Sequence, residues 1–412
     1  MNATIQTLKN REGKRELPEG WRWVKLGDLM PKFVGSLNPA NYSDETFVLH
    51  SIPAFDRSVP DIVFGKAIGS SKQVVLPGDV LLSKIVPHIR RTWVVGSNSG
   101  KRMIASTEWI VFRTTEAVSE YLKYALTDND FHREFMDTTS GVGGSLLRAR
   151  PALVAQIEIP LPPIPEQKRI AAILKEQMSA VEKARAAAQA RLAAVKALPA
   201  AFLRQVFPQV GQSLPEGWRW VKLGEVCNER TEIRNPVLEP ETVFKYVDIT
   251  SVSNTQKCIT EARQIIGKEA PSRARQVIRV NDVIVATTRP NLNAVAQVPP
   301  ELDNQICSTG FCVLRAQKGI FPDYLFAFVQ HEYFIKALTD LVNGALYPAV
   351  KDGQVFSQPI PLPPLADQQR IAANLKDQMA TADKARISSE EELNTINALP
   401  AALLRRAFNG EL

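Results

Sequence analysis

The chain has 412 residues, of which 45% are hydrophobic and 23% are charged, as in an ordinary soluble globular protein with room for two or three domains. No apolar run approaches the roughly 18 residues that a membrane-spanning helix needs, and four cysteines without a CxxC pair argue against a disulfide framework or a thiolate metal site. The net charge of +7 fits a polyanionic partner but is weak evidence for one by itself.

The first segment, residues 1–16, is basic and lacks the apolar core of a signal peptide. The cysteines (Cys227, Cys258, Cys307 and Cys312) all lie in the second half of the chain. Both features predict a protein of the reducing cytoplasm.

The chain is a tandem duplication with a period of about 200 residues, which suits a duplicated domain followed by a helix. The sequence LPEGWRWVKLG occupies residues 17–27 and returns letter for letter at 214–224. IPLPP at 159–163 likewise returns at 360–364. Related segments follow each copy, EQKRIAAIL and DQQRIAANL, and both close with ALPAA.

The opening part of each repeat, residues 17–164 and 214–365, predicts a mixed α/β (α+β) domain of about 150 residues. Short runs rich in Val and Ile are broken by turn pairs, Gly78-Asp79 in the first copy and Asn281-Asp282 in the second. Near the end of each domain, the segments starting at Ser119 and Pro322 each predict one amphipathic helix.

The closing parts, residues 165–207 and 366–412, predict long helices of about 33 residues, or roughly 50 Å. Pro199 and Pro400 should end or kink them. Apolar residues recur with a spacing near 3.5, as in a coiled coil. We expect the two helices to pair through Ile170, Leu174, Val181, Val195 and Leu198 of the first and Ile371, Leu375, Ile396 and Leu399 of the second.

The short linker at 208–213 places the second domain near the far end of the first helix. A parallel pairing would require a connection along the whole helix, and no segment is free to supply it. We therefore expect an antiparallel pair that holds the two domains apart around a pseudo-twofold axis.

The sequence shows no pattern of an active site. GSNSGKR at 96–102 has too few residues between its glycines for a phosphate loop and predicts a glycine-rich hairpin instead. The histidines (His50, His88, His132 and His331) have no metal-binding spacing.

Basic side chains cluster locally within both domains. Between Asp79 and Glu108 there is no acidic residue, and this stretch contains Lys84, Arg90, Arg91, Lys101 and Arg102. In the second domain, basic residues gather between Arg263 and Arg279, opposed only by Glu269.

A tandem pair of domains that open with LPEGWRWVKLG and close with IPLPP and EQKRIAAIL resembles the DNA-specificity subunit of type I restriction–modification systems. The resemblance covers nearly the whole chain. It implies target-recognition domains at 17–164 and 214–365, each reading half of a split asymmetric target in double-stranded DNA. It also implies a bacterial or archaeal source, no catalysis in this chain, and two adenine methyltransferase subunits and restriction/translocase subunits as partners. S-adenosylmethionine, ATP and magnesium would bind those partners.

The resemblance to this family makes the basic and amide side chains candidates for DNA contacts. Arg and Asn form bidentate hydrogen bonds with the edges of G and A, while Lys mostly contacts phosphates. The candidates are Lys84, Arg90, Arg91, Lys101, Arg102, Arg148, Arg150, Arg273, Arg275, Arg289, Asn291 and Asn293. The tryptophans of GWRW, identical in both copies, are interpreted as packing residues.

A second hypothesis is a protein-interaction scaffold, in which the domains bind proteins and the helices form a docking platform. Partner binding that is insensitive to salt and independent of DNA would favour it. Arginine clusters in loops favour the DNA hypothesis.

Overall fold

The computed structural model describes residues 15–97, 100–141, 147–342 and 348–412. The chain folds into two units, each of which combines one domain with parts of both long helices. The first unit contains Met1–Ala188 and Glu392–Leu412, and the second contains Gln189–Glu391. Within the described residues, no helix has both the length and the apolar character needed to cross a membrane.

The first unit contains a five-stranded and a three-stranded sheet, with strands of two to five residues, as the turn-rich sequence predicts. The larger sheet has the order β2-β5-β8-β3-β4, with β2 Ser36–Leu37, β3 Thr46–His50, β4 Asp61–Phe64, β5 Lys72–Val74 and β8 Met103–Ala105. The smaller sheet has the order β7-β6-β9, with β6 Val80–Ser83, β7 Thr92–Val94 and β9 Trp109–Phe112. The remaining elements are β1 Arg22–Lys25 paired with β12 Glu158–Leu161, β10 Thr139–Ser140 paired with β11 Arg148–Ala149, and helices α1 Ile52–Asp56, α2 Ser119–Ala125, α3 Asn129–Asp137 and α4 Pro151–Val154.

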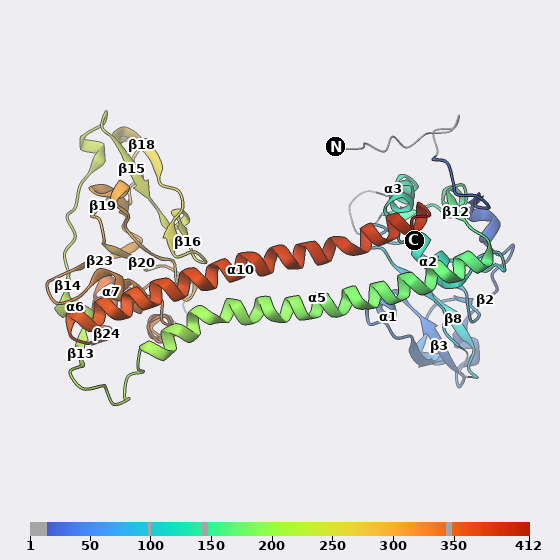
Figure 1. Cartoon of the computed structure of the whole chain (residues 1–412), viewed down its shortest axis with the longest axis horizontal. Helices are drawn as coiled ribbons and strands as arrows, with labels where there is room; N and C mark the ends of the chain where they lie inside the picture. Colours follow the sequence, from blue (N-terminus) through green and yellow to red (C-terminus); the bar gives the residue numbers. More distant parts are fainter. Residues whose placement is uncertain (1–14, 98–99, 142–146, 343–347) are drawn as a thin grey trace. The chain divides into compact units, whose positions relative to one another are not determined.

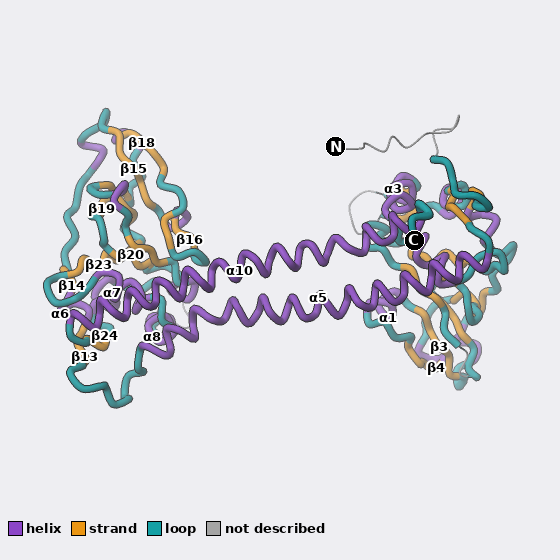
Figure 2. Tube along the Cα trace, viewed as in Figure 1, coloured by secondary structure: helices purple, strands orange, loops and turns teal. Residues whose placement is uncertain are grey.

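The second unit repeats this plan with two four-stranded sheets (Figure 2). One has the order β18-β15-β22-β19, with β15 Val243–Val247, β18 Arg263–Ile266, β19 Ala274–Ile278 and β22 Gln305–Ser308. The other has the order β14-β23-β20-β21, with β14 Cys227–Asn228, β20 Val283–Ala286, β21 Val295–Gln297 and β23 Phe311–Ala316. The remaining elements are β13 Arg219–Lys222 paired with β24 Pro359–Leu362, the hairpin β16 Val252–Ser253 with β17 Cys258–Ile259, and helices α6 Leu223–Val226, α7 Pro322–Val329, α8 Glu332–Asp340 and α9 Asp352–Phe356.

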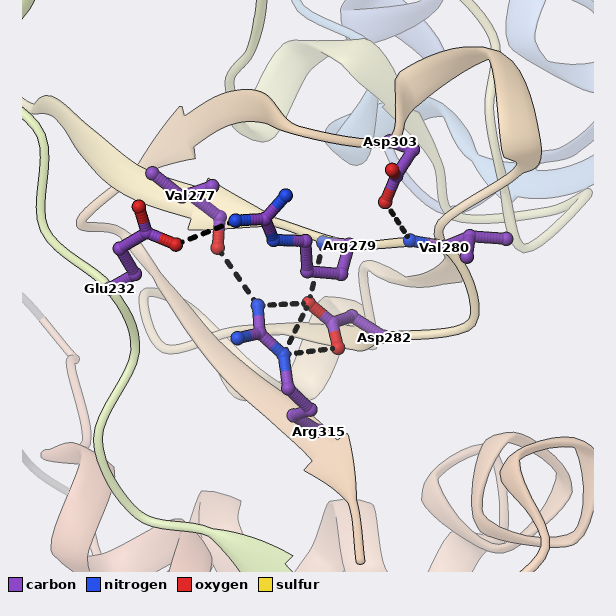
Figure 3. A network of polar contacts seen from close by, with 7 residues as sticks. All are labelled: Glu232, Val277, Arg279, Val280, Asp282, Asp303 and Arg315. Atoms are coloured by element: carbon purple, nitrogen blue, oxygen red, sulfur yellow. Dashed lines mark hydrogen bonds and ion pairs between the residues drawn. The ribbon is translucent and has the colours of Figure 1, made fainter.

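Buried polar contacts recur at matching positions and show that the two domains share one frame. The Tyr121 hydroxyl donates to the carbonyl of Pro160 at 2.7 Å, and the Tyr324 hydroxyl donates to that of Pro361 at 2.5 Å. In the second domain, buried Asp282 accepts three hydrogen bonds from the Arg315 guanidinium and one from the backbone N–H of Arg279 (Figure 3). Asp79 and Arg113 form the same pair in the first domain.

Two sequence predictions about the domains are wrong. Each predicted amphipathic helix is two helices, α2 and α3 or α7 and α8, because Asp128 and His331 accept hydrogen bonds as N-caps and start a second helix. The 96–102 segment is not a hairpin, since it connects β7 to β8 in a different sheet; residues 98–99 lie outside the described part.

The long helices, α5 Ile164–Val206 and α10 Leu365–Phe408, exceed the predicted length (Figure 1). Neither ends at its proline: α5 continues through Pro199 and α10 through Pro400. The residues beyond each proline include Phe207 and Phe408, which are 1% and 2% exposed and lie in the domain cores. This burial offsets the backbone hydrogen bond that each proline removes.

Within each unit, the two helices contact each other with antiparallel pairing. In the first unit Arg185 donates from Nε to the side-chain oxygen of Asn397 at 3.0 Å. In the second unit Lys196 Nζ lies 3.1 Å from a carboxylate oxygen of Glu390.

The residues predicted to pair the two helices, which form the apolar seam, fall into two groups. The central ones range from buried Val181 to half-buried Val195, Leu198 and Ile396, while Leu399 is 40% exposed. The residues near the start of each helix belong to the hydrophobic core of a domain. These are Ile170 and Leu174 in the first unit, and Ile371 and Leu375 in the second.

Candidate nucleic-acid interface

Two loops of equal length occupy the same place in the two domains. Residues 84–91 connect β6 to β7, and residues 287–294 connect β20 to β21. Each loop contains a left-handed residue directly before a proline, Val86 with φ 49° and Arg289 with φ 50°. This backbone conformation is costly for a residue with a side chain, and such strain concentrates at functional sites.

A second chain segment lies against each loop. In the first domain the N–H of Val86 donates to the carbonyl of Leu147 at 3.0 Å, and Ile85 forms an isolated β-bridge with Arg148. In the second domain the N–H of Arg289 donates to the carbonyl of Pro348 at 2.8 Å. We call each loop with its adjoining segment a loop pair: 84–91 with 147–150, and 287–294 with 348–351.

The first loop pair brings together Lys84, Arg90, Arg148 and Arg150, which the sequence places far apart. Arg90 is exposed, and its guanidinium contacts the neutral oxygens of Thr127 and Asn129 at 3.1 and 2.7 Å. Arg148 is exposed and faces Glu108 at 3.3 Å, while Arg150 is exposed and Lys84 is half-buried.

Arg91, at the end of the same loop, lies differently. It is 8% exposed, and its guanidinium donates to both carboxylate oxygens of Asp56 at 2.8 and 3.1 Å. The pKa of Asp56 is lowered by these bonds. This ion pair occupies the guanidinium in the described conformation.

Lys101 and Arg102 directly precede β8, a strand of the other sheet of the first domain. The Arg102 guanidinium pairs with Glu45 and stacks 4.0 Å from the ring centre of Tyr42. Hydrogen bonding to Glu45 raises the pKa of Arg102, which is consistent with a charged guanidinium. Lys101 is half-buried.

The second loop pair presents exposed Arg289 and Asn291 together with half-buried Asn293. Beside it lies a hollow of about 370 Å³, lined by Ile249, Thr250, Val252, Asn254, Thr288, Arg289, Leu292 and Ala294. Ala294 holds the position that Arg91 holds in the first domain, and it is one of the residues that line the hollow.

The basic cluster between Arg263 and Arg279 is largely neutralised. Arg263 pairs with Asp248, Lys268 with Glu241, and Arg279 with Glu232. Of the two candidates in this region, Arg273 is exposed, while Arg275 is half-buried and donates to the carbonyl of Ala274.

Sequence reasoning missed exposed residues at the tips of both loops: His88 and Ile89 in the first and Leu292 in the second. His88 corresponds to Asn291 when the strand pair β6–β7 is aligned with β20–β21. An alignment of the two repeats would therefore have identified His88. In the part of the chain that the structure describes, no group of three or more His, Cys, Asp or Glu side chains could hold a metal ion.

Comparison with known proteins gives one consistent result. The model of the type I restriction modification DNA specificity domain matches residues 18–188 and again 215–395. The MjaVIII specificity subunit of Methanocaldococcus jannaschii is 24% identical, covering 90% of this chain and 88% of that protein. The EcoKI specificity subunit of Escherichia coli is 27% identical over 48% of this chain and 44% of that protein.

Solved structures agree. A chain from a structure on complex assembly and conformational transition of the type I restriction–modification system matches 97% of this chain and all of its own length, with TM-score 0.79 and 25% identity. The HsdS subunit from Thermoanaerobacter tengcongensis matches the same shares of both chains with TM-score 0.65 and 25% identity. The chain thus belongs to the type I restriction–modification DNA specificity family, as a non-catalytic specificity subunit with two target-recognition domains.

Proposed function

We propose that each domain reads one half of a bipartite DNA target through its loop pair. The observation that carries this proposal is a shared frame with different loops: the pairs Tyr121–Pro160 and Tyr324–Pro361 match, whereas the loops between equivalent strands read KIVPHIRR and TTRPNLNA. Similar frames with different exposed side chains suit two unlike half-sites.

Within each loop pair, the chemistry of the side chains suggests a division of roles. Arg90, Arg289 and Asn291 are exposed and of the types that form bidentate contacts with base edges. Lys84, Arg148 and Arg150 suit phosphate contacts, which position the domain without reading sequence. Arg102 lies on a different sheet and would contact the DNA backbone outside the half-site.

The long helices would set the separation of the two half-sites and dock two methyltransferase subunits. Restriction/translocase subunits would complete the complex. S-adenosylmethionine, ATP and magnesium would bind to those partners, and the complex would act in the cytoplasm. In this proposal the recognition domains are residues 17–164 and 214–365. The long helices are residues 165–207 and 366–412, and residues 208–213 link the first helix to the second domain.

Selection of bound duplexes from a random pool, by the chain assembled with its methyltransferase subunits, tests the proposal. We expect one asymmetric motif made of two half-sites with a fixed gap. The substitution Asn291→Ala should weaken the base preference in one half-site only. A single continuous motif, or no motif, would contradict the proposal.

A further inference from the structure

The two domains fasten their loops in different ways. In the first domain, Arg91 follows the loop residue Arg90 directly and is held by Asp56 at the end of α1. In the second domain, Ala294 replaces this arginine and cannot form an ion pair. Another contact holds the loop end there.

That contact comes from Lys257, in the hairpin between β16 and β17. Its Nζ donates to the backbone carbonyl of Asn293 at 2.7 Å, across 36 positions of sequence. The hairpin also packs on β21, since Val252 shares a buried cluster with Ala294 and Ala296. Packing thus places the hairpin beside the loop, and the hydrogen bond joins the tip of Lys257 to the loop end.

The backbone at this contact is unusual on both sides. Lys257 has φ 55° and Asn293 has φ 46°, and Arg289 at the other end of the loop has φ 50°. Left-handed conformations are uncommon for lysine and arginine, whereas asparagine adopts them more readily, and the surrounding contacts help to hold them. The hydrogen bond from Lys257 is one such constraint on Asn293.

The charge of Lys257 is not used within the domain. Among the described residues its ammonium makes no ion pair, although it is half-buried. Burial lowers its pKa to about 8. Placing a cation in a partly buried site without an ion pair costs stability, so the contact with the loop is explained better by loop position than by folding.

We infer that Lys257 is a positioning residue for DNA recognition, which fixes the 289–293 loop of the second domain in the conformation that reads its half-site. Asp56 performs the same task in the first domain through Arg91. This inference rests on the proposed function, because it concerns how the reading loops are held.

Selection from a random duplex pool, with the chain assembled with its methyltransferase subunits, tests the inference on Lys257→Met and Asp56→Asn. Lys257→Met should reduce base preference in the half-site of the second domain at least about fivefold, the lower end of one bidentate base contact, and leave the other half-site intact. Asp56→Asn should reduce base preference in the half-site of the first domain and leave the half-site of the second domain intact. Lys257→Arg, which keeps a donor, should restore part of the preference.

A merely structural role predicts a different pattern. It would lower the midpoint of thermal unfolding of Lys257→Met and weaken binding to all sequences equally, and this result would overturn the inference. Unchanged half-sites in a folded Lys257→Met variant would also overturn it. If the wild-type chain itself selects no split motif, the proposed function fails instead.

Discussion

The Arg90 guanidinium donates from Nη1 to the side-chain oxygen of Asn129 at 2.7 Å, so the loop of the first domain contacts the first turn of α3, and Arg90 forms no ion pair with the residues that the structure describes. The proposed role of this exposed guanidinium is a DNA contact. Arg90→Ala should weaken binding of the target by about 1–3 kcal/mol if the contact is to a base, or flatten the salt dependence if it is to phosphate. Titrations at several salt concentrations distinguish the two cases.

Arg91→Ala is the matched comparison, because the neighbouring side chain is buried against Asp56. It should lower the free energy of unfolding by about 1–2 kcal/mol, as expected for loss of charged hydrogen bonds, whereas Arg90→Ala should leave it unchanged. Urea denaturation measures both. Equal stability of the two variants would contradict the different roles assigned to them.

The ends of the long helices should stabilise one unit each. Phe408 packs against Tyr121 in the first unit, with ring centres 5.5 Å apart, and Phe207 packs against Tyr324 in the second at 5.3 Å. Replacing either phenylalanine with alanine should cost about 3–5 kcal/mol in its own unit. Hydrogen exchange resolved by peptide reports the units separately.

Val210→Ala is the control for this pair, since Val210 is 47% exposed just beyond α5 and should change neither unit. A loss of protection spread equally over both units, from either phenylalanine variant, would show that the helix ends do not act locally.

His331 predicts a pH dependence in the second unit. Its Nδ1 accepts the N–H of Tyr333 at 3.3 Å as the N-cap of α8, a role that the protonated ring loses. Burial lowers the pKa of His331 below its usual 6.5, with Glu332 opposing the shift and Arg204 adding to it. The unfolded chain therefore binds the proton more readily, and stability present above pH 6.5 is lost as the pH falls below that value.

His331→Asn should remove this dependence, because asparagine caps a helix without titrating. Unit-resolved hydrogen exchange on both sides of pH 6.5 should show acid destabilisation of α8 in the wild-type chain and less in the variant. The same acid response in both proteins would assign the effect to other groups.

The sequence predicts the elements that depend on local patterns and repeats. The identical LPEGWRWVKLG segments become β1 and β13 with the helical turns that follow them, and the apolar spacing becomes α5 and α10. Sequence-based prediction fails where a contact with a residue distant in the sequence determines the structure. Pro199 does not end α5 because Phe207 is anchored in the core of the domain.

The candidate site follows the same rule. The cluster from Lys84 to Arg102 is visible in the sequence, but its division between two sheets is not. The burial of Arg91 depends on Asp56, 35 positions earlier, and no spacing rule connects them. The contact from Lys257 to a backbone carbonyl leaves no signal in the sequence, since any residue can supply a carbonyl.

We propose that two recognition domains read DNA at a separation set by the helices. Inserting seven residues into the middle of both α5 and α10 adds one heptad to each, which keeps the apolar seam in register and lengthens each helix by about 10 Å. At about 3.4 Å per base pair, the gap between half-sites should grow by up to roughly three base pairs. The half-site sequences should stay the same, because no reading residue changes.

An insertion in one helix alone should disrupt the pairing and weaken assembly, which makes it the control. The decisive measurement is a map of methylated adenines in cells that express the double insertion with its methyltransferase subunits. We expect the original half-sites with a longer gap. An unchanged gap in a protein that folds and assembles, or altered half-sites, would contradict it.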